Sequence, residues 1–70
     1  MDAESLRIAI LKSGKTNRDL AAAIGISEQA FYNKLNGKAE FKSSEIRKLG
    51  ELLGLSLEDM GSIFLGVSVN

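Results

Sequence analysis

Apolar residues recur every three or four positions along most of the chain, which is the period of an amphipathic α-helix. No long polar or repetitive segment interrupts this pattern. The sequence therefore predicts an all-α protein of five short helices. We expect these helices at about Glu4–Ser13, Asn17–Ile24 and Glu28–Asn36, from Ser43 or Ser44 to Leu53, and from Leu57 onward.

Polar caps and glycines mark the ends of these helices. Thr16 is followed three residues later by Asp19, as in a capping box, and Ser27 stands where the third helix needs an N-cap. Ser43 or Ser44 is the expected N-cap of the fourth helix. Glycine readily ends a helix in the left-handed conformation, and it follows four predicted helices, at Gly14, Gly25, Gly37 and Gly54.

The chain of 70 residues is long enough for one domain, which we expect to span residues 1–70. The sequence contains no His and no Cys, which excludes disulfides, the usual zinc and iron–sulfur sites, and Ser-His or Cys-His nucleophile pairs. We therefore expect no enzyme activity, no metal, no cofactor and no small-molecule ligand. The start is acidic where a signal peptide is basic, and the longest uncharged run is too short to cross a bilayer. We expect a cytoplasmic protein without membrane contact.

Charge is unevenly distributed although the net charge is zero. Residues 1–48 contain all nine Lys and Arg and six Asp and Glu, whereas residues 49–70 contain three acidic residues and no basic one. The first part carries a net charge of +3 and the second −3. One face of the protein can therefore suit phosphates despite the zero total.

The second and third predicted helices are joined by only Gly25, Ile26 and Ser27. A glycine in so short a joint makes two helices cross steeply, and the small side chain of Ala21 lets them approach closely. We therefore expect a helix-turn-helix at about residues 17–36, whose second helix presents a polar face to solvent.

Side chains on and around that face have the groups that bind DNA. Amides bind adenine bidentately, and a carboxylate accepts from the amino group of cytosine. The expected base-reading residues are Glu28, Gln29, Tyr32 and Asn33. Lysines, arginines and amides are the usual partners of phosphates. The expected phosphate-binding residues are Lys15, Asn17, Arg18, Lys34, Asn36, Lys38 and Lys42.

Two segments carry a resemblance to a known family. The segment TNRDLAAAIGIS at residues 16–27, with Asn36-Gly37-Lys38, resembles the helix-turn-helix of the Cro/CI-type phage repressors, the XRE family. LLGLSLED at residues 52–59 is similar to the joint between the fourth and fifth helices of that family. The resemblance covers about residues 4–65 and implies a compact five-helix, lambda-repressor-like domain. The resemblance also implies a function, that of a transcriptional regulator of the prophage repressor type. Such a regulator acts as a homodimer on a pseudo-palindromic operator in double-stranded DNA.

The resemblance also implies roles by position. Asn17 takes the place of the residue that anchors the second helix on a phosphate. Asn36 and Lys38 fall where the family contacts the DNA backbone. The base-reading places fall on Glu28, Gln29 and Asn33.

Three positions depart from the family pattern. Position 34, usually apolar, is Lys, and the apolar residue follows at Leu35, so that either Asn33 or Lys34 faces the DNA groove. Glu28 would repel phosphates unless a cytosine or a nearby basic group offsets its charge. Gly50 stands inside a helix where Ala is usual, which costs roughly 0.5–1 kcal/mol unless it permits close packing.

The sequence also supports an alternative function. The zero net charge and Glu28 favour a small protein-interaction module, an antitoxin-like or anti-repressor protein that keeps the fold.

A second joint has the same pattern as the first. Leu53-Gly54-Leu55-Ser56 repeats the form of the joint at residues 24–27. Glu58 and Asp59 open the helix after it and would repel phosphates, so we expect this second joint to be structural.

The last apolar segment, residues 62–70, has no single predicted role. Ile63-Phe64-Leu65 is expected to close the core rather than to form an interface. Val67-Ser68-Val69 alternates as a strand does, and it is expected to be an edge strand, a tail on the core or a dimer contact.

Overall fold

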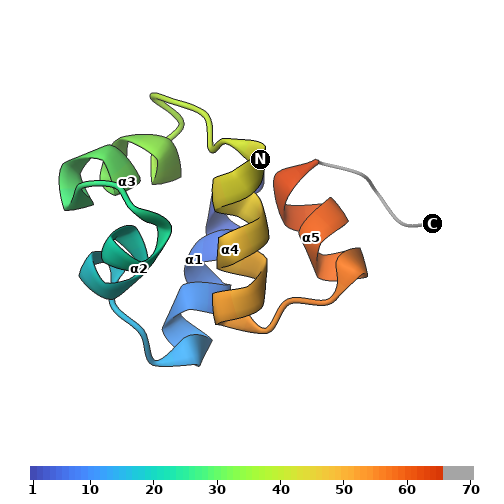
Figure 1. Ribbon diagram of the computed structural model, residues 1–70. Coiled ribbons are helices and arrows are strands. Elements are labelled where there is room, and N and C mark those ends of the chain that lie inside the picture. Colours follow the sequence, from blue (N-terminus) through green and yellow to red (C-terminus); the bar gives the residue numbers. More distant parts are fainter. Residues whose placement is uncertain (66–70) are drawn as a thin grey trace.

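The computed structural model describes residues 1–65, and these residues form five α-helices. In chain order they are α1 (Ala3–Ser13), α2 (Asn17–Ile24), α3 (Glu28–Leu35), α4 (Ser43–Leu53) and α5 (Leu57–Phe64). Figure 1 shows α4 near the middle, with α2 and α3 on one side of it and α5 on the other. Over residues 1–65 the predicted all-α class with five helices is confirmed. Within residues 1–65 no helix has the length and apolarity that a membrane crossing requires.

Local caps explain where α2 begins and ends. The backbone N–H of Asp19 donates to Thr16 Oγ1 at 3.1 Å, and the N–H of Thr16 donates back to Asp19 Oδ2 at 3.4 Å. At the other end Gly25 has a φ of 82°, a left-handed conformation that glycine adopts at little cost, and its N–H donates to the Ala22 carbonyl at 3.2 Å. The predicted range Asn17–Ile24 is confirmed.

Helix α3 ends one residue earlier than predicted, at Leu35. Gly37 has a φ of 81°, in the left-handed region, and the N–H of Lys38 donates to the Asn33 carbonyl at 2.8 Å. The Asn33 carbonyl accepts this bond in place of the bond that a further helical turn would require. Asn36 therefore lies outside the helix as its C-cap.

The prediction that Ser43 or Ser44 caps α4 is wrong. Both serines lie in the first turn of α4, and the N-cap residue is Lys42. Because a lysine side chain has no acceptor, the capping bond is made by another residue. Glu45 Oε1 accepts from the Lys42 N–H at 2.8 Å, which is the carboxylate half of a capping box.

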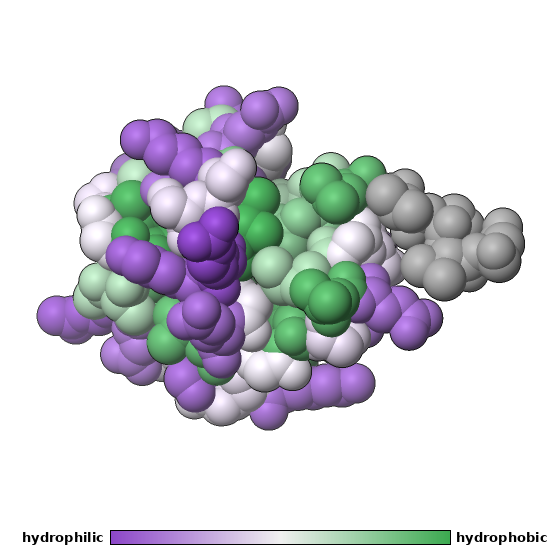
Figure 2. Space-filling model, turned by 45° about the vertical axis from the view of Figure 1, so that its right-hand side comes forward, coloured by the Kyte–Doolittle hydropathy of each residue, from purple (hydrophilic) through white to green (hydrophobic). Residues whose placement is uncertain are grey.

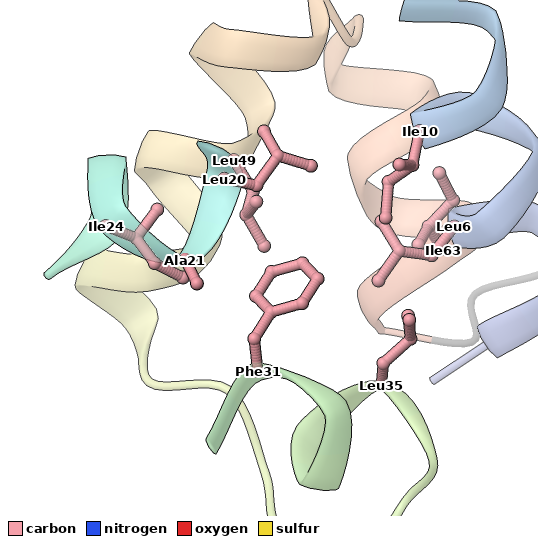
Figure 3. Close-up of a cluster of buried hydrophobic side chains, with 9 residues drawn as sticks. All are labelled: Leu6, Ile10, Leu20, Ala21, Ile24, Phe31, Leu35, Leu49 and Ile63. Atoms are coloured by element: carbon pink, nitrogen blue, oxygen red, sulfur yellow. The ribbon is translucent and has the colours of Figure 1, made fainter. Parts of the chain in front are cut away.

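Phe31 of α3 lies at the centre of the hydrophobic core. Figure 3 shows its ring between side chains of α2 and α4 on one side and those of α1 and α5 on the other. Fully buried Leu6, Leu20 and Leu49 bring α1, α2 and α4 around it. The other buried apolar residues are Ile10, Ala21, Ile24, Leu35 and Ile63. All five helices therefore share one core, and α3 is fixed to it by the fully buried ring of Phe31.

The loop between α3 and α4 adds an aromatic side chain to this core, which the helical period does not predict. The ring of Phe41 packs edge-on against Phe31, with centroids 5.7 Å apart, and against Phe64, with centroids 6.1 Å apart. Phe41 thereby links α3 to α5.

Gly50 allows the side chain of Met60 in α5 to pack against the backbone of α4. A β-carbon on this buried glycine would lie 2.5 Å from Met60 Sδ and 2.8 Å from Met60 Cε, closer than such atoms approach. The glycine inside α4 therefore makes room for the side chain of Met60.

The C-terminal apolar segment divides between core and surface. Ile63 is buried and Phe64 is half-buried. The carbonyl of Ile63 accepts from the N–H of Asp2 at 2.7 Å, which ties the start of the chain to α5. Leu65, in contrast, is 74% exposed. Val67-Ser68-Val69, predicted as an edge strand, tail or dimer contact, lies outside the described residues.

Candidate nucleic-acid interface

Helices α2 and α3 pack directly against each other and are joined by three residues. Ala21 is buried in the same core cluster as Phe31, and the N–H of Ile26 donates to the Ala21 carbonyl at 3.0 Å. Ser27 Oγ then accepts from the Ala30 N–H at 3.0 Å and fixes the start of α3, as predicted. The joint thus holds α3 in one orientation on α2, with one face in the core and the other in solvent.

The solvent face of α3 carries the four residues predicted to read bases. Glu28 and Gln29 are exposed, Tyr32 is 42% exposed and Asn33 is half-buried. Gln29 Nε2 donates to Asn33 Oδ1 at 3.2 Å. Gln29 therefore offers its carbonyl oxygen to solvent and Asn33 its amino group, an acceptor beside a donor.

Glu28 places a negative charge at the start of this face. It lies in the first turn of α3, where a carboxylate is stabilised by the helix dipole. Among residues 1–65 it forms no salt bridge. Its charge is therefore presented to any ligand that approaches the face.

Lys34, predicted to bind phosphate or to face the DNA groove, is paired with a carboxylate instead. Its Nζ lies 2.6 Å from Glu45 Oε1, and the two side chains are 12% and 7% exposed. Nζ also lies 6.0 Å from the centre of the Phe41 ring, within the range of a cation–π contact. Leu35 supplies the buried apolar contact instead. Lys34 therefore adds no free charge to the outer face, and it is Asn33 whose side chain joins that face.

Glu45 is ionised although it is buried. Burial acts to raise the pKa of this carboxyl group, but hydrogen bonds from the Lys34 ammonium and the Lys42 N–H act in the opposite sense and prevail. The pKa of Glu45 consequently lies below its ordinary value. The carboxylate is charged at neutral pH and holds Lys34 in place.

Three predicted phosphate-binding residues line one groove. Lys15, Asn17 and Asn36 border a hollow of about 380 Å³ between α1, the start of α2 and the end of α3. Tyr32 lines it too, so that the groove continues the solvent face of α3. Apart from Lys34, the remaining predicted phosphate-binding residues are exposed and do not line this groove: Arg18, Lys38 and Lys42.

Comparison with known proteins places the chain in a family. A family model described as "Protein of unknown function (DUF739)" matches residues 1–66, almost the whole chain. The chain belongs to the DUF739 family. No curated protein and no solved structure matches it. The family description names no activity, so the chemistry of this DUF739 protein is inferred from its own residues.

One basic residue of this DUF739 protein lies at the same surface without having been predicted there. Arg7, an exposed residue of α1, lines the groove and donates from Nη2 to Asn36 Oδ1 at 2.5 Å. The helical period shows only that Arg7 is off the apolar face of α1. Its partner is 29 residues away along the chain, so no local pattern indicates the contact.

Proposed function

We propose that this DUF739 protein is a sequence-specific double-stranded DNA-binding regulator of transcription that places α3 in the major groove. The observation that carries the proposal is the hydrogen-bonded pair of amides, Gln29 and Asn33, on the solvent face of a helix that the core holds rigidly. The resemblance to Cro/CI-type phage repressors supports the same interpretation, with α2 and α3 as the helix-turn-helix. The five-helix fold agrees with that resemblance.

The amide pair has the polarity that adenine requires. In the major groove adenine presents an acceptor at N7 and a donor at N6. The bond from Gln29 Nε2 to Asn33 Oδ1 leaves Gln29 Oε1 to accept and Asn33 Nδ2 to donate. Tyr32 and Glu28 stand beside this pair, and the Glu28 carboxylate can accept from the amino group of cytosine. We therefore assign base reading to these four residues.

Phosphate binding falls to residues around α3, and Lys34 is not among them. The charge of Lys34 is already neutralised by Glu45. Contacts to the DNA backbone fix the register of a protein on the duplex without reading sequence. We assign this role to Lys15, Asn17, Arg18, Asn36, Lys38 and Lys42.

We further infer a cytoplasmic homodimer that binds a pseudo-palindromic operator, as in prophage repressors. Helix α3 has only eight residues, and four of them form the reading face, so one copy reads a short half-site. Two copies related by a two-fold axis would place their α3 helices in successive major grooves, about 34 Å apart.

Binding of the full chain to a labelled duplex of random sequence, measured at increasing salt, tests the proposal. Each phosphate contact releases counterions, so the logarithm of affinity should fall with the logarithm of salt concentration by about 0.9 per contact. Several contacts per copy would make the dependence steep. Affinity that does not change with salt, or no binding at low salt, would contradict the proposal.

A second candidate function is favoured by apolar side chains on another part of the surface. Leu57 is 92% exposed and Leu65 is 74% exposed. Figure 2 shows hydrophobic residues gathered on the side of the molecule where α5 lies. With the zero net charge and the free carboxylate of Glu28, they favour an antitoxin-like or anti-repressor module that binds another protein. The same titration separates the two functions, because such a module would not bind duplex DNA.

A further inference from the structure

Arg7 and Asn36 are joined by a hydrogen bond between the first helix and the end of the third. Arg7 lies in α1, Asn36 is the C-cap of α3, and Arg7 Nη2 lies 2.5 Å from Asn36 Oδ1. The bond occupies the oxygen of the Asn36 amide and leaves Nδ2 as a donor. Arg7 therefore sets the direction in which the Asn36 amide faces.

Arg7 and Asn36 line two hollows. One of them also contains Glu40, whereas the groove between α1, the start of α2 and the end of α3 contains no acidic side chain. Arg7 and Lys15 supply two cations, Asn17 and Asn36 supply amides, and Tyr32 supplies a hydroxyl. Within residues 1–65 no Asp or Glu forms a salt bridge with either cation. The apolar side chains of Ile10, Leu11 and Leu35 line the groove as well. The two unneutralised cations and the donors at its polar positions fit an anion.

The guanidinium of Arg7 can bind such an anion while it holds Asn36. Arginine has five N–H donors in a planar fork, and that fork matches the oxygens of a phosphate. The bond to Asn36 uses Nη2, so donors on the other nitrogens stay available. An anion bound by these donors can also accept from Asn36 Nδ2.

We propose that this groove binds a phosphodiester of the DNA backbone, and that Arg7 acts there both as a phosphate contact and as a positioning residue for Asn36. The inference rests on the proposed function and extends the DNA interface to α1. Tyr32 belongs both to the groove and to the solvent face of α3. The phosphate bound in the groove therefore flanks the base pairs that α3 reads.

Duplex binding by the variant Arg7→Gln, measured against salt, tests the contact. Loss of one phosphate contact is expected to reduce the slope of log affinity against log salt by about 0.9. Lys12→Gln is the matched control, because it removes one charge from the same helix but Lys12 lines a different groove, against the joint between α4 and α5. We expect the control to keep the slope of the unaltered chain. Equal slopes in the two variants would overturn the contact.

A double-mutant cycle tests the positioning role. If Arg7 orients the Asn36 amide, then Asn36→Ala should reduce affinity by a smaller factor in the Arg7→Gln background than in the unaltered chain. Equal factors in both backgrounds would overturn this role. A purely structural effect would instead move the urea midpoint of unfolding, which we expect to be unchanged in Arg7→Gln because the side chain is exposed.

These experiments distinguish failure of the proposed DNA-binding function from failure of the Arg7 contact alone. An unaltered chain that does not bind duplex DNA would overturn the proposed function and this inference with it. An unaltered chain that binds DNA with a salt slope equal to that of Arg7→Gln would overturn the inference alone.

Discussion

Lys34 Nζ lies 2.6 Å from Glu45 Oε1, and this contact ties the last turn of α3 to the first turn of α4. The same Glu45 oxygen accepts from the Lys42 N–H and so begins α4. One nearly buried carboxylate therefore fixes the start of α4 and the direction of α3. Helix α3 is the one that we propose reads DNA.

Removal of one partner of this pair is expected to destabilise the fold. Lys34→Met leaves the Glu45 carboxylate buried without its ammonium, and it should lower the free energy of unfolding by about 3 kcal/mol. The double variant Lys34→Met/Glu45→Gln has no buried charge and keeps an acceptor for the Lys42 N–H. We expect it to recover most of the loss. Urea unfolding measures both, and an equal loss in the two variants would rule out the unpaired charge as the cause.

The same pair predicts how stability depends on pH. In the folded protein the pKa of Glu45 lies below its ordinary value of 4.5. A carboxyl group whose pKa is lowered by folding stabilises the protein above the unfolded pKa, and this contribution is lost as the pH falls through the folded pKa. We therefore expect the free energy of unfolding to decrease below about pH 4.5, where the unfolded chain begins to bind the proton.

The variant Glu45→Gln is the control for this pH dependence. The pKa of Asp2 is also lowered, by hydrogen bonds from Ser5, so that the unaltered protein alone does not isolate Glu45. The difference in stability between the unaltered protein and Glu45→Gln removes the Asp2 contribution. We expect this difference to shrink as the pH falls below about 4.5, and a constant difference would contradict the assignment.

Two glycines are expected to respond oppositely to alanine. Gly25 has a φ of 82° in the joint between α2 and α3, and Gly25→Ala should cost about 1–2 kcal/mol because the left-handed conformation strains a β-carbon. Gly61 lies within α5, and nothing lies within 4 Å of the position of its added β-carbon. Gly61→Ala should stabilise by up to about 1 kcal/mol through helix propensity. Thermal unfolding compares the two, and changes of the same sign would refute the prediction.

Base reading and phosphate binding are expected to respond differently to mutation. Gln29→Ala should relax the base preference at one position, at a cost of about 1–3 kcal/mol on the preferred site. Lys38→Ala should weaken binding to all sequences alike and reduce the salt slope by about 1. Competition between the preferred duplex and a scrambled one measures both. If Gln29→Ala leaves the preference intact, the assignment of the reading face is wrong.

Helices could be predicted from the sequence where their signals are local. Thr16 and Asp19 are three residues apart and Gly25 follows them, so that both ends of α2 were predictable. The cap of α4 was not, although its signal is also local. Ser43 has the better side chain for an N-cap, but the carboxylate of Glu45 satisfies the Lys42 N–H and makes Lys42 the boundary.

Contacts between distant segments could not be predicted in this way. Lys34 stands next to Leu35 at the edge of the core face, where a long side chain can direct its ammonium inward or outward. Its partner lies 11 residues away, and the closure of the loop decides the outcome. Phe41 and Arg7 escaped prediction for the same reason, because each acts through contacts made only in the folded chain. The proposed reading face was predictable because its residues share one helix.

Selection from a pool of random duplex DNA by the full chain, with the enriched sequences determined, tests the central claim most directly. The account predicts an enriched inverted repeat whose half-sites lie about one helical turn, roughly 10 base pairs, apart. A pool that shows no enrichment over the starting sequences would contradict sequence-specific DNA binding through α3.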